Sequence, residues 1–296
     1  MDGMYLIPFG PNANCTLDLC PLESSVLEYL PSLGGNITFI CIFAVLLFVH
    51  SALGVLWKSW WFLACMTLGC LTEIIGYGGR VMLYYNPFSF AGFMMQIICI
   101  GCAPVFYSAA IYVTMAKIVE NLDPSLSRIR PYLYYVIFIT SDVFSLTLQG
   151  VGGGLSTSTS GSSQAAVDLS LVGLSFQVFS MVVFCALLAD YMIRYSKSRS
   201  RATISTRLRL FLIFLSIAIV LILARCGYRV AELSDGYTGG LIHNEPLFIG
   251  LDGVLIAVAV FALCIGHPGL VFLPSEEGMK VPESSIEEDG IVLQNK

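Results

Sequence analysis

Charged residues are scarce in this chain of 296 residues, at only 12% of the sequence. A soluble domain carries about 25% charged residues, and half of that amount cannot give a chain of this size a polar surface. Hydrophobic types make up 56% of the sequence, and the mean hydropathy is +0.81. The composition therefore excludes a soluble fold and a disordered chain, and it predicts a membrane protein.

Several other signals are missing. The net charge of −5 argues against a nucleic-acid partner, which would need a basic face. No strictly alternating strands indicate an outer-membrane barrel, and no G-x-x-x-x-G-K-[ST] motif indicates direct use of ATP. The first residues lack the basic start and apolar core of a cleavable signal peptide. We predict no cofactor and no metal, and the sequence carries no signal for an oligomeric state.

Seven apolar stretches are long enough to cross the hydrocarbon layer, which takes about 20 residues of helix. We expect them at 33–56, 60–83, 91–117, 131–151, 166–190, 208–230 and 247–266. The predicted fold is an all-α membrane protein with seven transmembrane helices. Its predicted parts are an extracellular N-terminal segment (1–32), a transmembrane domain (33–270) and a disordered acidic cytoplasmic tail (271–296).

Lysine and arginine predict the orientation of the chain, because cytoplasmic loops hold them preferentially. Residues 1–32 contain none, and the loops after the second, fourth and sixth spans contain none either. The loops after the first, third and fifth spans do contain them. We therefore predict that the N-terminus lies outside and the C-terminus in the cytoplasm. The Ser/Thr/Gly-rich stretch 152–163 is expected to be a flexible exterior loop.

The N-terminal segment contains two features of exported protein surfaces. Asn14-Cys15-Thr16 is a glycosylation sequon, which predicts a modification at Asn14. Cys15 and Cys20 lie in the same segment, where oxidation is possible. A disulfide between them and two free thiols are both open alternatives.

Ionisable groups at membrane depth are costly, at roughly 2.5–3.5 kcal/mol on insertion scales, and they often mark a pathway or a site. Their positions along the spans place most of them in the outer half and Glu73 and Asp142 near the middle. We expect a polar cavity that opens outward, with these two acids as its floor. Its predicted residues are Glu73, Arg80, Gln96, Asp142, Gln149, Arg225, Arg229, Glu232, Glu245 and Asp252. The alternative is a set of interhelical ion pairs that only lock the bundle.

The chain has only three histidines, and their positions disfavour one enzyme class. His50 is expected toward the inner side, His243 outside and His267 at the inner end of the last span. They cannot all meet at one point, which argues against a zinc-dependent hydrolase such as a ceramidase-like enzyme. We predict no enzyme. His50 is either a buried, hydrogen-bonded residue or part of an inner gate.

Short motifs follow one another in a specific order over roughly residues 29–270. They are Tyr29-Leu30-Pro31-Ser32, Trp60-Trp61, Glu73-Ile74-Ile75-Gly76-Tyr77-Gly78-Gly79-Arg80, Ala103-Pro104-Val105-Phe106, Gly152-Gly153-Gly154, Tyr228-Arg229 and His267-Pro268-Gly269. In this order they resemble the lipid-translocating exporter family of fungi, a group linked to aminocholesterol resistance. The resemblance implies a fungal seven-span protein of the plasma membrane. It also implies a link to movement of sphingoid long-chain bases, to sterol-analogue or drug resistance, and to porphyrin traffic.

The leading hypothesis is movement or export of an amphipathic lipid such as a sphingoid long-chain base. The amine of such a ligand would meet Glu73, Asp142 and Asp252, whereas Gln96 and Gln149 would bind its hydroxyl groups. The arginines would partner the acids in the empty site or bind an anionic head group. The alternative is a seven-helix lipid sensor or receptor that regulates membrane lipid asymmetry. In either case the expected partners are membrane lipids and an amphipathic small molecule.

Overall fold

We analysed a computed structural model, which describes residues 6–158, 164–197, 206–236 and 240–269. Within these ranges the regular elements are all helical, and seven spans are long and apolar enough to cross a membrane. The prediction of a multi-pass, all-α membrane protein with seven spans is confirmed. The orientation in the membrane stays a prediction, and the predicted acidic tail lies outside the described residues.

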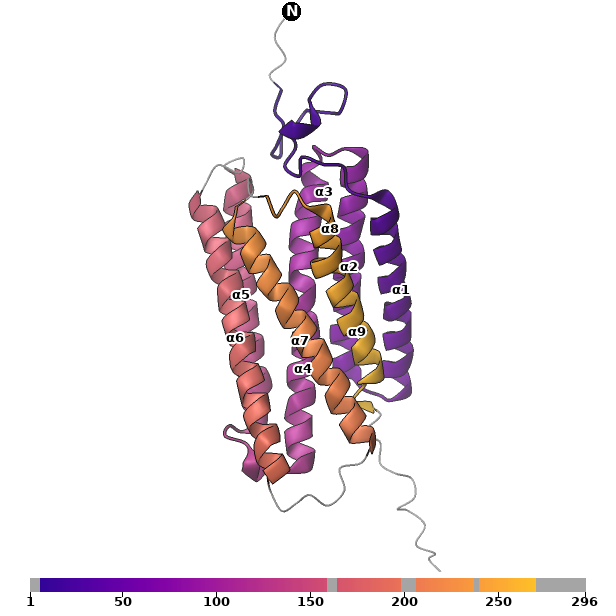
Figure 1. The fold of residues 1–296 in the computed structure, drawn as a ribbon, viewed down its shortest axis with the longest axis vertical. Coiled ribbons are helices and arrows are strands. Elements are labelled where there is room, and N and C mark those ends of the chain that lie inside the picture. The colour runs from indigo at the N-terminus through magenta and orange to yellow at the C-terminus, as the bar shows by residue number, and fades with distance from the viewer. Residues whose placement is uncertain (1–5, 159–163, 198–205, 237–239, 270–296) are drawn as a thin grey trace, which may run out of the picture.

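The spans follow the chain in order (Figure 1). The first three are α1 (Leu33–Leu56), α2 (Trp60–Tyr85) and a composite of α3 (Phe90–Met95), η2 (Gln96–Ile100) and α4 (Gly101–Leu122). The next three are α5 (Pro131–Ser158), α6 (Gln164–Lys197) and α7 (Thr206–Ser234). The seventh joins α8 (Glu245–Leu247), η4 (Phe248–Val254) and α9 (Leu255–Ile265). Of two short 3₁₀ turns, η1 (Leu22–Ser24) precedes the first span and η3 (Pro124–Leu126) lies between the third and fourth spans.

Several helices are longer than the apolar stretches that predicted them. The fifth span, expected at 166–190, runs over 164–197. Residues 152–158 are also a correction, because they continue α5 instead of forming an exterior loop. The reason is packing against α6, since a Cβ on Gly152 would lie 2.7 Å from the Ala166 carbonyl oxygen. Glycine there lets the two backbones approach closely.

The helices pack around the third and sixth spans. α5 and α6 pair on one side of the bundle, while α1, α2 and α9 form the other side (Figure 1). α4 and α7 lie between these groups, and the largest buried cluster, which includes Phe43, Tyr107 and Phe211, fills the space among them. Many apolar side chains remain exposed on the outside of the bundle, such as Phe48 and Phe179. That surface is expected where lipid surrounds the helices.

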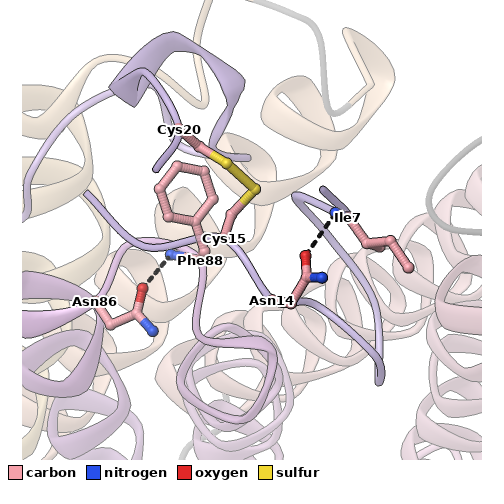
Figure 2. The surroundings of a disulfide bond; sticks show 6 residues. All are labelled: Ile7, Asn14, Cys15, Cys20, Asn86 and Phe88. Carbon is pink, nitrogen blue, oxygen red and sulfur yellow. Dashed lines mark hydrogen bonds between the residues drawn. A yellow bond between two sulfur atoms is a disulfide. The ribbon is translucent and has the colours of Figure 1, made fainter. Parts of the chain in front are cut away.

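The N-terminal segment lies across one end of the bundle (Figure 1). Figure 2 shows the disulfide between Cys15 and Cys20, which packs against Phe88 in the connection between α2 and α3. The exposed Asn14 accepts a hydrogen bond on Oδ1 from the Ile7 backbone N–H at 2.7 Å. Glycosylation of Asn14 stays a prediction.

Candidate functional site

A cavity of about 120 Å³ lies in the half of the bundle nearest the N-terminal segment. Six of the ten predicted site residues line it, namely Arg80, Gln96, Gln149, Arg225, Arg229 and Glu232. The rest of the wall is mainly apolar, with Leu27, Ile97, Leu146, Leu174, Ile242 and Phe248 among its residues. We call this space the arginine cavity. It combines charged groups with an apolar wall, as a site for an amphipathic molecule must.

Arg80 is held in place by contacts with four residues. Its Nε donates to Asn36 Oδ1 at 2.9 Å, and its Nη2 donates to Tyr29 Oη at 3.1 Å and to Glu245 Oε1 at 3.3 Å. Its guanidinium also lies over the ring of Phe248, 4.0 Å from the ring centroid. Burial raises the pKa of the Tyr29 hydroxyl above its usual value, so this group stays protonated at neutral pH. Arg80 therefore joins the N-terminal segment to three spans.

Arg225 stabilises a broken turn of the third span. In an α-helix the residue at position 104 would donate its N–H to the Ile100 carbonyl, but Pro104 has no N–H to donate. The Nη2 of Arg225 donates to that carbonyl at 2.7 Å instead. The same guanidinium forms a buried ion pair with Asp252. Because the bilayer offers no water to unpaired backbone groups, this arginine supplies a bond that the helix lacks.

Two π-helical turns meet at this arginine. η2 contains Gln96 and ends at Ile100, and η4 contains Asp252. Arg225 contacts both turns, through the Ile100 carbonyl and the Asp252 carboxylate. Turns of this kind are rare and are often found at functional sites. Their position on the two spans beside the arginine cavity supports a functional role for this region.

Arg229 and Glu232 form an ion pair on the last turns of α7, and both line the arginine cavity. Their side chains are 15% and 8% exposed, against 2% for Arg225. Glu232 is also the single acidic residue among those that line the cavity. A cation that enters this space therefore meets Glu232 before any other carboxylate.

The cavity wall includes amide groups from two spans, the third span and α5. Gln149 on α5 donates to Ser145 Oγ at 2.9 Å and to Gln177 Oε1 on α6 at 3.1 Å. Gln96 is buried, and its Oε1 has no hydrogen-bond partner within the described residues. This oxygen is an unused acceptor beside the cavity, and a ligand would reach it once the side chain turns toward that space.

The cavity reaches the lipid-facing surface between the third span and α5. Ile98 lines it and is 49% exposed, and the lining Gly150 and Gly154 on α5 are exposed as well. A volume of about 120 Å³ holds a polar head group or several water molecules but not a long hydrocarbon chain. An apolar tail attached to such a head group would therefore extend past Ile98 into lipid.

Four predicted residues do not line this cavity. Glu73 is buried near Arg225 and Asp252, and Asp252 and Glu245 lie behind the arginines that they pair with. Asp142 is buried beside the Tyr112 hydroxyl, although the two groups do not meet the geometry of a hydrogen bond. The expected floor of Glu73 and Asp142 is therefore absent from this cavity. Depth along a span was estimated from the sequence, but the direction in which each side chain points was not.

The ion-pair alternative and the cavity alternative both describe part of this region. Arg80 and Arg225 pair with acids of the seventh span, which links α2 and α7 to it. The same two arginines line the cavity. Tyr29, Asn36 and Phe248 complete the site, although neither charge nor depth in a span indicates them. Tyr29 and Asn36 belong to the region that resembles the family, and this resemblance is the signal that indicates them.

None of the three histidines lines the arginine cavity. His50 is buried toward the other end, with Nε2 3.2 Å from the Val260 carbonyl oxygen and 3.1 Å from Cys264 Sγ. His267 packs on Phe62, as His50 does, whereas His243 lies 3.7 Å from Glu28. Within the described residues no group of three His, Cys, Asp or Glu side chains is placed to hold a metal ion. The gate role of His50 stays a prediction.

Comparison with known proteins places this geometry in context. A family profile described as RTA1-like protein matches residues 66–275. The sphingoid long-chain base transporter RSB1 of Saccharomyces cerevisiae is 32% identical over 280 residues, which cover 82% of this chain and 73% of the relative. Protoporphyrin uptake protein 1 of the same yeast is 28% identical over 204 residues, or 67% of this chain and 66% of the relative. Protein RTM1, also of Saccharomyces cerevisiae, is 27% identical over 202 residues, which cover 67% of this chain and 64% of the relative. No solved structure matches the chain.

Proposed function

Because the chain belongs to the RTA1-like protein family, we propose that it moves an amphipathic lipid across the membrane, with the polar head in the arginine cavity. A sphingoid long-chain base is the first candidate substrate, since one relative is named a transporter of such bases. The observation that carries the proposal is a cavity with charged residues in its wall that also reaches lipid beside Ile98. A head group and a hydrocarbon tail could then occupy different surroundings at the same time.

In this proposal, each polar residue of the cavity wall has its own role in binding the substrate. An amine on the substrate would compete with Arg229 for Glu232, the acid that lines the cavity. Gln96 Oε1 would accept a hydrogen bond from a substrate hydroxyl. This assignment replaces Glu73, Asp142 and Asp252, which we expected to bind the amine. The proposal names no energy source.

The test is flux of a labelled sphingoid base in vesicles that contain the purified protein. We expect Glu232→Gln to lower the flux by about tenfold, because a lost charge-assisted contact is worth about 1.5–3 kcal/mol. Asp168→Asn is the matched control, since Asp168 is an exposed acid near the same end of the bundle on α6 and lies outside the cavity. It should leave the flux unchanged.

Two outcomes would contradict the proposal. Equal flux in the Glu232→Gln and Asp168→Asn variants would remove Glu232 from substrate binding. If the wild-type protein binds the lipid but produces no net movement, the sensor alternative replaces transport. Native mass spectrometry of gently purified protein provides a separate check, in which an amine-bearing lipid should copurify.

A further inference from the structure

A second cavity, of about 470 Å³, lies at the opposite end of the bundle. It is formed by the turn between α1 and α2, the end of α4 and the residues after α9. Its wall consists of Leu56, Trp57, Lys58, Ser59, Trp61, Phe62, Val113, Thr114, Lys117, Pro268 and Gly269. We call it the lysine cavity. It shares no residue with the arginine cavity, and the inference below does not depend on the proposed function.

The charge of the lysine cavity is one-sided. Lys58 and Lys117 line it, whereas none of its wall residues is acidic. Both lysines are exposed, and neither forms an ion pair with any part of the chain that the structure describes. Two unneutralised ammonium groups that border one hollow favour an anionic ligand with several acceptor oxygens.

The backbone at Lys58 carries a second signal. Its φ is +51°, in the left-handed region that glycine adopts without penalty. This turn follows α1 directly, where glycine is the usual residue. A lysine there costs roughly 1 kcal/mol of backbone energy, which favours a use for its side chain.

The remaining wall residues indicate that the ligand is a lipid. Trp57, Trp61 and Phe62 provide aromatic surface, and Leu56 and Trp61 are 72% and 48% exposed toward the surroundings of the bundle. Tryptophan is typical of the level at which lipid head groups meet the acyl chains. A small soluble anion would use the lysines and leave this apolar wall uncovered.

The location fits an anionic lipid in particular. Lys58 and Lys117 are at the end where the other cations of the interhelical connections also gather, including Arg130 and Lys197. The positive-inside rule predicts that this end is cytoplasmic, and the cytoplasmic leaflet holds the anionic lipids.

We propose that the lysine cavity binds an anionic phospholipid, with the phosphate of the head group between Lys58 and Lys117. One acyl chain lies along Leu56 and Trp61. The site is thus a lipid-binding position in the leaflet opposite to the arginine cavity.

The three tryptophans of the whole chain make this proposal testable, because Trp57, Trp60 and Trp61 all lie at this turn. Tryptophan fluorescence, excited selectively over the 14 tyrosines, therefore reports on this region alone. The full chain is placed in nanodiscs that contain a brominated phospholipid, either anionic or zwitterionic, at equal mole fraction. We expect the anionic lipid to quench the wild-type protein more strongly.

The variants separate a site from general surface charge. Lys58→Gln combined with Lys117→Gln should lower the preference for anionic lipid by about 30-fold, since each of the two cations near an anionic leaflet contributes about 1 kcal/mol. Arg130→Gln removes an exposed cation at the same end that does not line the cavity, and the preference should persist. Lys58→Gly removes the charge and relieves the backbone, so it should lose part of the preference without loss of thermal stability.

Three results would overturn the proposal. The first is equal quenching by both lipids in the wild-type protein. The second is an equal loss of preference in the Arg130→Gln variant, which would indicate diffuse surface charge. The third is relief of the selective quenching by inorganic phosphate alone, which would assign the cavity to a soluble phosphate compound.

Discussion

At the scale of single residues, Arg225 has the largest structural role in this region. It is 1% exposed, and it forms an ion pair with the Asp252 carboxylate. It also donates a hydrogen bond to the Ile100 carbonyl, which Pro104 leaves without a donor. A lysine at this position could not replace it, because an ammonium group lacks the planar fork that reaches two acceptors in fixed directions. The residue therefore couples the third, sixth and seventh spans.

We predict that Arg225→Met lowers the free energy of unfolding by about 3–5 kcal/mol, because it leaves a buried carboxylate without its cation. Arg128→Met is the control, since its ion pair with Asp190 is exposed and contributes little to stability. Unfolding in mixed micelles can be followed with a thiol-reactive dye, because Cys65, Cys70 and Cys226 are buried and free. Similar losses in the two variants would contradict this ranking.

At the scale of helices, the approach of α2 to the third span depends on several glycines, and Gly79 makes the closest contacts with backbone atoms. A Cβ on Gly79 would lie 2.6 Å from the Gly92 carbonyl oxygen and 3.0 Å from the Gln96 backbone nitrogen. Backbone atoms cannot move aside as a flexible side chain can. The contact therefore fixes the position of η2, and with it Gln96 in the cavity wall.

Substitution of two adjacent glycines should separate packing from helix propensity. Gly79→Ala should destabilise the protein by about 1–3 kcal/mol through overpacking. Gly78→Ala should have no effect or stabilise slightly, because a Cβ there meets nothing within 4 Å and alanine favours the helix. Thermal stability of both variants in the same detergent is the measurement, and a loss confined to Gly78→Ala would refute the interpretation.

The helices were predictable from the sequence, but their rotation was not. Hydropathy finds the spans because lipid requires about 20 apolar residues, and it therefore predicts the order and number of helices. Charged and amide side chains are rare within apolar spans, and six of those that we selected line the arginine cavity. Glu73 and Asp142 point to neighbours outside this cavity. A span such as the first is apolar on most sides and carries little information about which face turns inward.

At the scale of the whole molecule, the N-terminal segment covers the end of the bundle that contains the arginine cavity. Leu27 and Tyr29 contribute to the cavity wall, and the Cys15–Cys20 disulfide packs this segment against Phe88 (Figure 2). Access from this end therefore depends on a segment outside the spans.

We predict that Cys15→Ala combined with Cys20→Ala speeds the labelling of Cys102 by a water-soluble maleimide several-fold. Cys102 is a free thiol in the cavity wall, and loss of the disulfide loosens the segment above it. Peptide mass spectrometry measures the labelling, and addition of Cys102→Ala should abolish the extra signal. An unchanged rate would mean that the segment does not control access.

The two π-helical turns have a mechanical consequence. Each holds one residue more than an α-helical path of the same length requires. Such a surplus residue can migrate along its helix, because each step only exchanges neighbouring backbone partners. One step rotates the side chains that it passes by about 100°, so Gln96 or Asp252 would face a new neighbour while the ends of the helix stay anchored. The third and seventh spans therefore each contain an extra residue that allows part of the helix to rotate about its own axis.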